Sequence, residues 1–425
     1  MNVPLSGPQD AEPGGGAAAA TPGRMVFKRF IGRVRGGTQG PTVLAVGGVH
    51  GNEPAGAHAL KRVLDRLAFP GIEIHGDFVA LAGNVRALNA GTRFLERDLN
   101  RAWGPAEIAA MDDAGPTRTP TPTAPPAQVH APVPAPAPAH AERAEARERR
   151  ELREAIDKAV GQARGPVFFL DLHSTSADGY PFAVVADTLQ NNEFARHFPL
   201  PVILGLEELL DGLMVEYAQS RGCRTMAVEG GQHDAPATVE NLEAAVWLAL
   251  SATGLLARGF TREVARAYDR LDRARGDLPR VIEVLARHPV RPEHAFKMEP
   301  GFANIARTHA GQVLARDRTG AIRAPAAGVV LLPLYQAQGE DGFFLGREVP
   351  PWRLRLSAAL RRAHVDALLP LLPGVRRGDG AHDQLEVAPR LARLYPPELF
   401  QLFGFRKMRA ADDRLLVSRR RPQGP

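Results

Sequence analysis

The chain has very little cysteine: Cys223 is the only one among its 425 residues. A single thiol can form neither an intramolecular disulfide bond nor a metal site built from several thiolates. Cys223 lies just before the apolar run 225–228, which is typical of a core strand. We therefore expect a buried and unreactive thiol rather than a catalytic nucleophile.

Long apolar runs are missing as well. No segment approaches the roughly 18 consecutive apolar residues that a membrane-spanning helix needs, so we expect no membrane partner. Residues 1–23 are rich in proline, glycine and alanine, and they lack the basic segment and long apolar stretch of a secretion signal. This composition predicts a disordered tail over residues 1–23 and a cytoplasmic protein.

The chain also lacks a strong excess of one charge. Its 53 Lys and Arg oppose 47 Asp and Glu, which leaves a formal net charge of +6. This excess is modest for the length of the chain, and no motif interleaves aromatic with basic residues. These features argue against a nucleic-acid partner and favour an ordinary solvated surface. Nothing in them specifies an oligomeric state.

Strand and helix patterns alternate over most of the chain. The apolar run 42–49 is followed by apolar residues at helical spacing from Leu60 to Leu67, and then by a strand pattern at 78–82. This order predicts an α/β fold with helices packed on a sheet. Regularly spaced glycines after Pro289 indicate a smaller β-rich domain. The expected units are a catalytic domain at 24–285, a β-rich domain at 290–350 and a C-terminal extension at 351–425.

A proline-rich segment interrupts the alternation at residues 112–140. Nine prolines lie between Pro116 and Pro138, interspersed mainly with alanine and threonine. Proline removes backbone donors and fixes φ, so this segment is predicted to be a disordered insertion. A helix is expected to resume over 141–163, with its charged side chains on a solvated face.

Three strand patterns end in residues that can bind a metal or move a proton. His50 and Glu53 follow the run 42–49, His173 ends the run 167–173, and Glu229 follows the run 225–228. The carboxyl ends of parallel strands are where α/β sheets place their chemistry. Two His and one Glu are ligands typical of a catalytic zinc with a position left for water, and a further Glu could be the general base. The pattern predicts one Zn²⁺ per chain.

Two further groups of residues bear on this site. Asp171, two residues before His173, is either a partner of a ligand or a purely structural carboxylate. The segment 84–101 is dense in Asn and Arg, and its Arg93, Asn100 and Arg101 suggest recognition of a substrate carboxylate. The alternative is that these arginines pair with acidic residues of the same segment.

Four segments, GGVHGNEPAG, TRFLERDLNRAW, LDLHSTS and VEGG, together resemble the succinylglutamate desuccinylase and aspartoacylase family of zinc carboxypeptidase-like enzymes. The resemblance implies an exopeptidase-like mixed sheet flanked by helices and followed by a smaller β-rich domain. The implied site residues are zinc ligands His50, Glu53 and His173, the base Glu229, the carbonyl-polarising Arg93, and Asn100 and Arg101 as substrate-binding residues.

The function implied by this resemblance is zinc-dependent hydrolysis of the amide bond in a small N-acyl amino acid or a related carboxylate-bearing substrate. The alternatives are a zinc carboxypeptidase that acts on peptides and a non-catalytic ligand-binding protein on the same scaffold.

The sequence departs from the family pattern at two places. Phe343 and Phe344 stand where the aspartoacylase branch has a substrate-binding tyrosine, which favours less acidic substrates than N-acetylaspartate. A family arginine about ten residues before the base also has no secure match, since Gln219 has that spacing and Arg221 and Arg224 lie nearby.

Overall fold

The computed structural model describes residues 26–69, 72–113, 144–256, 260–378, 383–388, 390, 394–411 and 414–419. The expected tail at 1–23 and residues 114–140 of the expected insertion lie outside these ranges. Within them, no helix is both long enough and apolar enough to cross a membrane.

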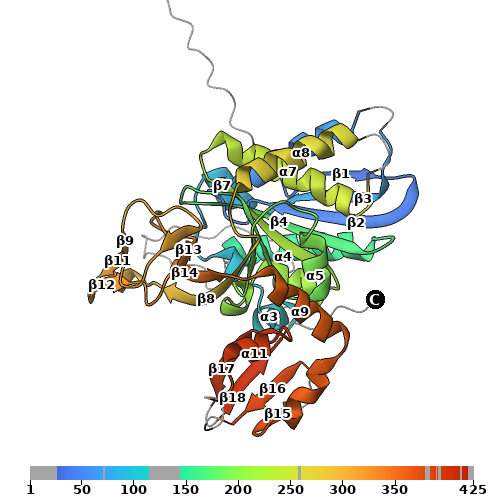
Figure 1. The fold of residues 1–425 in the computed structure, drawn as a ribbon. Helices are drawn as coiled ribbons and strands as arrows, with labels where there is room; N and C mark the ends of the chain where they lie inside the picture. The colour runs from blue at the N-terminus through green and yellow to red at the C-terminus, as the bar shows by residue number, and fades with distance from the viewer. Residues whose placement is uncertain are drawn as a thin grey trace, which may run out of the picture.

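An eleven-stranded mixed sheet forms the centre of the molecule (Figure 1). Its strands, in spatial order, are β1 (Phe30–Arg35), β3 (His75–Ala82), β2 (Thr38–Gly47), β4 (Val167–Thr175), β7 (Arg224–Gln232), β5 (Phe182–Val185), β6 (Val202–Leu204), β8 (Val281–Pro289), β14 (Asp341–Glu348), β13 (Gly328–Leu331) and β10 (Ala306–Thr308). Strands β3, β2, β4 and β7 are parallel, whereas β1 and β5 run antiparallel to their neighbours β3 and β7. The predicted α/β class with a mixed sheet is confirmed.

Helices cover both faces of this sheet, because its central strands are apolar on both sides. In β2, Val43 and Ala45 belong to one buried core, and Leu44 and Val46 belong to the other. The helices that contribute to the first core are α1 (Ala55–Leu67), α5 (Leu189–Ala195), α7 (Pro236–Ala252) and α8 (Thr261–Arg275). The second core receives α4 (Ala144–Gly161) and α6 (Met214–Ser220), and the connecting segment there holds α2 (Val85–Ala90), the 3₁₀ turn η1 (Leu99–Arg101) and α3 (Pro105–Asp113).

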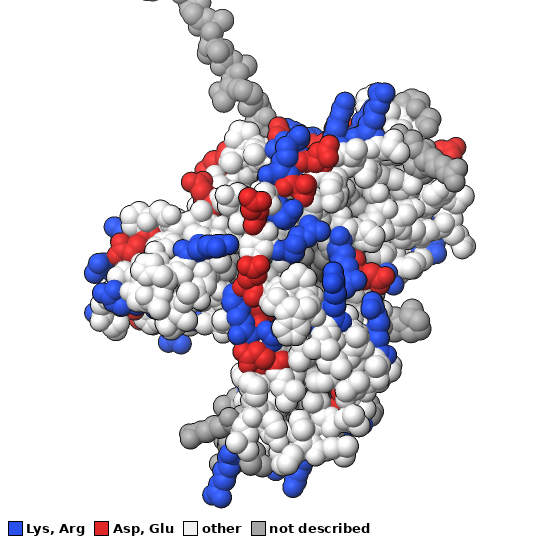
Figure 2. Space-filling model, in the orientation of Figure 1, with Lys and Arg blue, Asp and Glu red and all other residues white. Residues whose placement is uncertain are grey.

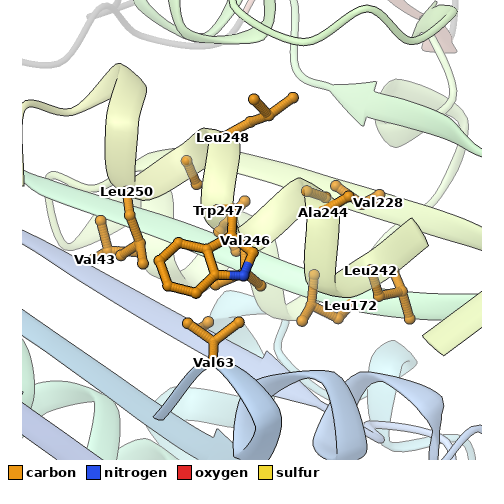
Figure 3. Packing of buried hydrophobic residues seen from close by; sticks show 14 of the residues in the cluster. Val43, Val63, Leu172, Val228, Leu242, Ala244, Val246, Trp247, Leu248 and Leu250 are labelled. Carbon is orange, nitrogen blue, oxygen red and sulfur yellow. The ribbon is translucent and has the colours of Figure 1, made fainter. Parts of the chain in front are cut away.

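The first core shows how local periodicity becomes packing. The predicted helical stripe Leu60, Val63, Leu64 and Leu67 is buried in α1, as the spacing indicates. Figure 3 shows Val63 of α1 near Trp247 of α7, with residues of β2, β4 and β7 in the same cluster. These contacts anchor the strands that carry the candidate site.

The main sheet continues beyond the last parallel strand. Strand β8 pairs with β6 on one side and with β14 on the other, so the sheet passes from the α/β part into the β-rich part through one strand. A second sheet, β12-β11-β9 (Gly320–Arg323, Val313–Asp317 and Lys297–Met298), packs there on β13 and β14. A 3₁₀ turn, η3 (Pro292–His294), leads into it.

The C-terminal residues form a packed unit that the sequence pattern did not predict. It contains α9 (Pro351–Arg362), η4 (Val365–Leu371), α11 (Pro397–Gln401) and the sheet β15-β16-β18-β17 (Val375–Arg377, Gln384–Val387, Arg414–Ser418 and Lys407–Ala411). Its own core includes Phe400, Phe403 and Phe405. Buried ion pairs join it to the main sheet, since Arg406 pairs with Asp187 and Glu283. On the face drawn in Figure 2, acidic and basic side chains are interspersed.

The structure confirms that Cys223 is buried, and burial raises the pKa of its thiol to about 12. Because the thiolate is the reactive form, we expect no alkylation of the folded protein by iodoacetamide at pH 8. After unfolding in urea, one equivalent of label should be incorporated, as measured by mass spectrometry. Stoichiometric labelling of the folded protein would contradict the burial of this thiol.

Candidate metal and catalytic site

The carboxyl ends of β2, β4 and β7 meet at one edge of the sheet. His173 of β4 is paired in register with Glu229 of β7, while His50 and Glu53 occupy the turn between β2 and α1. All four line one pocket of about 130 Å³. A larger cavity of about 530 Å³ lies between α5 and α9, and its lining includes none of the predicted site residues.

Two glycines give the turn that carries His50 and Glu53 its shape. Gly48 has a φ of +76°, a conformation that L side chains rarely adopt. At Gly51, a Cβ atom would lie 2.1 Å from the backbone carbonyl carbon of Ala87. The Gly51 N–H also donates to the Arg93 carbonyl at 2.9 Å. The turn therefore packs directly against the segment that carries Arg93.

The Glu53 carboxylate bridges the two histidines. Its Oε1 is 2.9 Å from His50 Nδ1, and its Oε2 is 3.1 Å from His173 Nδ1. The Ser174 N–H donates to the same Oε2 at 3.1 Å. All three side chains are buried, and their donor atoms lie within 4.8 Å of one another. Two imidazole nitrogens and a carboxylate oxygen are thus held at one point.

A second carboxylate lies behind each histidine. His50 Nε2 is 3.1 Å from Asp98 Oδ1, and His173 Nε2 is 2.9 Å from Asp171 Oδ2. Burial alone would raise the pKa of Asp98, but the charges of His50 and Arg93 hold it well below its usual range. Burial would likewise lower the pKa of His173, but Asp171 and Glu53 raise it well above its usual value.

This arrangement fits a tetrahedral metal ion. At metal–ligand distances near 2.1 Å, neighbouring tetrahedral ligand atoms lie about 3.4 Å apart, close to the separations of the Glu53 oxygens from the two Nδ1 atoms. Metal-binding histidines usually donate their other N–H to a carboxylate, as Asp98 and Asp171 would allow here. The buried carboxylates also favour a cation at this place.

Glu229 has an oxygen available for chemistry. Its Oε2 is buried and has no hydrogen-bond partner among the described residues. Burial, opposed by His173 and reinforced by the carboxylates of Glu53 and Asp171, raises the pKa of Glu229 to about 8. A buried carboxylate without a partner is costly in a structural role, whereas a group that accepts protons from bound water needs a free oxygen.

Residues 39–118 match the model of the succinylglutamate desuccinylase/aspartoacylase catalytic domain. Over this range the chain is similar to that family. The matched range contains His50, Glu53 and the segment with Arg93, Asn100 and Arg101, whereas His173 and Glu229 lie beyond it. A comparison with curated protein sequences found no match.

The chain is also similar to solved structures. A succinylglutamate desuccinylase/aspartoacylase from Rhodobacter sphaeroides is 17% identical, with a TM-score of 0.52 over 75% of this chain and 88% of that one. A succinylglutamate desuccinylase from Vibrio parahaemolyticus is 15% identical, with a TM-score of 0.46 over 74% and 82%. Murine aminoacylase 3 is 18% identical, with a TM-score of 0.44 over 73% and 95%.

The three residues expected to contact substrate lie beside the turn that carries His50 and Glu53. Arg93 donates to Glu53 Oε1 at 3.2 Å and to Asp98 Oδ2 at 3.3 Å. Asn100 is buried and accepts a hydrogen bond from the Met214 N–H at 2.9 Å. Arg101 forms an ion pair with Asp341. All three line the pocket, but each already has partners within the protein.

The two phenylalanines expected at the substrate end have different environments. Phe344 lines the pocket, whereas Phe343 stacks on His288 in the core of the β-rich part, with ring centroids 5.0 Å apart. The expectation that both face the substrate is therefore wrong for Phe343. Neighbours on a strand point to opposite faces of the sheet, and the polar group that the strand contributes to the pocket is Asp341.

No residue near position 219 supplies the missing family arginine. Gln219 is buried, Arg221 pairs with Asp157 at 3.0 Å, and Arg224 lies over the ring of Phe168. None of the three is among the described residues that line the pocket.

The connection between β13 and β14 covers one side of the site, which the sequence did not reveal. Gln336 accepts a hydrogen bond from Asn52 Nδ2 at 2.9 Å and lies 3.2 Å from His233 Nε2. His233 Nδ1 lies 2.8 Å from the Ser174 hydroxyl. His233 follows Glu229 by only four residues, but nothing in the local pattern separates it from a surface histidine.

Helix α4 holds the segment that carries Arg93 and Asp98. Glu145 is buried, and its carboxylate accepts the backbone N–H groups of Leu95, Glu96 and Arg97 at 2.6, 3.0 and 3.3 Å. Glu148 is also buried and accepts the N–H groups of Val85 and Arg86 at 2.9 and 3.2 Å. The expectation that the charges of this helix are all solvated is wrong for these two residues.

Replacement of Glu145 by alanine should leave three backbone N–H groups without their acceptor. We expect a loss of about 2–4 kcal/mol in the free energy of unfolding, measured with urea, together with faster hydrogen exchange at residues 95–97. Glu154→Ala, an exposed position on the same helix, is the control and should change stability by less than about 0.5 kcal/mol. Equal stability of the two variants would rule out the anchoring role.

Proposed function

We propose that the chain is a zinc-dependent hydrolase that cleaves the amide bond of a small N-acyl amino acid or a related compound. The observation that carries this proposal is the joint placement of an N₂O donor set and the unpartnered Glu229 oxygen in one pocket. Similarity to the succinylglutamate desuccinylase/aspartoacylase family supports the reaction class.

Zinc held by His50, Glu53 and His173 would supply a water of lowered pKa and a Lewis acid for the substrate carbonyl. Glu229 is the proposed general base, because it lines the pocket and its buried Oε2 has no hydrogen-bond partner among the described residues. It removes a proton from the attacking water and delivers it to the leaving amine.

Arg93 is the proposed stabiliser of the negative charge that develops on the carbonyl oxygen. Its guanidinium lies beside Glu53 and His50, so it is close to the reacting centre. Its buried Nε has no partner among the described residues and remains available as a donor. Asn100 and Arg101 are the proposed substrate-binding residues of the same pocket.

The dimensions of the pocket favour a small substrate over a peptide. Its volume of about 130 Å³ is enclosed on one side by the connection that bears Gln336. A carboxypeptidase would use the same donor set, so comparison of N-acyl amino acids with peptides distinguishes the two activities. A non-catalytic ligand-binding protein would have no evident use for the unpartnered Glu229 oxygen.

The metal assignment makes a stoichiometric prediction. The purified protein should bind about one equivalent of zinc, measured by atomic emission, because the described residues hold one such donor group. His173→Ala should lose the metal, whereas His197→Ala, at an exposed position, should retain it. Full zinc occupancy in the His173 variant would remove His173 from the ligand set.

The base assignment predicts separation of metal binding from turnover. Glu229→Gln preserves size and polarity but cannot accept the water proton, so kcat/KM should fall by ~10²-fold or more with zinc retained. Glu193→Gln, at an exposed position, should behave as the parent protein. Near-normal turnover by the Glu229 variant would show that another group accepts the proton.

A further inference from the structure

An ion pair crosses the pocket from the metal-binding part to the β-rich part. Arg101 of η1 donates through Nη2 to Asp341 Oδ2 at 2.7 Å, and the two side chains are only 16% and 14% exposed. Arg287 of β8 donates through Nε to Asp341 Oδ1 at 2.5 Å. Each carboxylate oxygen of Asp341 thus accepts a hydrogen bond from a different arginine, one in η1 and the other in β8.

This pairing changes what Arg101 can offer to a ligand. Its Nη1 donates to the Asn100 carbonyl at 2.9 Å, so each terminal nitrogen already has one acceptor, while the buried Nε has no hydrogen-bond partner among the described residues. An arginine normally binds a carboxylate through such nitrogens in a fork geometry. A substrate carboxylate that binds the Nη2 edge of Arg101 would compete with Asp341 there and leave this largely buried carboxylate with fewer partners, which is costly.

Arg93, the other arginine among the described residues that line the pocket, is already paired with Glu53 and Asp98. The apolar residues of the pocket lining include Leu206, Leu210, Leu213, Val215, Leu334 and Phe344. Burial alone would lower the pKa of Arg101. The negative charges of Asp98, Asp341 and Glu340 outweigh this effect and raise it. This end of the pocket is therefore internally neutralised and apolar.

We propose that Asp341 determines substrate specificity by occupying the anion position of Arg101, so that the enzyme prefers acyl groups or side chains that are uncharged and apolar there. This inference rests on the proposed function. Asp341 acts as an internal counter-ion and need not touch the reacting atoms. The preference against acidic substrates expected from Phe343 and Phe344 is then caused by a carboxylate and not by the lack of a tyrosine hydroxyl.

A binding experiment tests the counter-ion directly. Succinate affinity is measured by calorimetry for the parent protein, Asp341→Asn and Asp341→Ser, with zinc and again after chelation. We expect both Asp341 variants to bind succinate at least ~10-fold more tightly than the parent protein. The double variant Asp341→Asn/Arg101→Met should lose this gain, because the arginine that binds succinate is then absent. Melting curves verify that each variant is folded.

Glu340→Gln is the matched control, because it removes the same charge one residue away at an exposed position. It should tighten succinate binding much less than Asp341→Asn. An equal gain from Glu340→Gln, or no gain in either folded Asp341 variant, would overturn the proposal.

A kinetic experiment then relates the ion pair to turnover. N-acetyl-L-asparagine and N-acetyl-L-aspartate differ mainly in side-chain charge, and the parent enzyme should prefer the former. Asp341→Asn should shift the ratio of their kcat/KM values by ~10-fold toward the aspartate compound. Normal turnover with an unchanged ratio would defeat the specificity proposal alone. If the zinc-loaded parent protein hydrolyses none of the N-acyl substrates, the proposed function is wrong. The succinate measurements would still test whether Asp341 occupies the anion position of Arg101.

Discussion

The Glu53 carboxylate is the contact on which the candidate site depends. It joins His50 and His173, which come from strands separated by more than one hundred residues, and it also accepts the Ser174 N–H. A buried carboxylate requires such partners to offset its loss of hydration. Glu53 finds these partners where the ends of β2 and β4 meet. The geometry of the donor set therefore depends on the two cores, because their packing holds these strands together.

The same principle extends outward from the metal ligands. Asp98 and Asp171 lie behind the imidazoles, and Glu145 holds the backbone of the segment that presents Asp98. On the opposite side, Asp341 neutralises Arg101. The pocket is thus built from charges that are mostly compensated within the protein, while the buried Oε2 of Glu229 has no hydrogen-bond partner among the described residues. In the proposed function, catalysis and selectivity therefore depend on different carboxylates.

Much of the central fold could be predicted because its signals are local. The helical spacing of Leu60 to Leu67 and the apolar run 42–49 specify α1 and β2 without knowledge of their neighbours. Placement of His50, Glu53, His173 and Glu229 together follows from one further rule, that neighbouring parallel strands end at the same edge of a sheet. The donor set was therefore accessible to sequence reasoning.

The contacts that shape the rest of the protein join residues far apart in the chain, and no local period announces them. Glu145 resembles a solvated helix charge until the backbone of Leu95 to Arg97 lies against it. The C-terminal unit has short strands in a region rich in arginine and proline, and it is joined to the main sheet by the ion pairs of Arg406. Residue types and strand ends identified the metal donors, but only tertiary structure could determine that Arg101 faces Asp341, because an arginine's charge reveals nothing about which carboxylate reaches it.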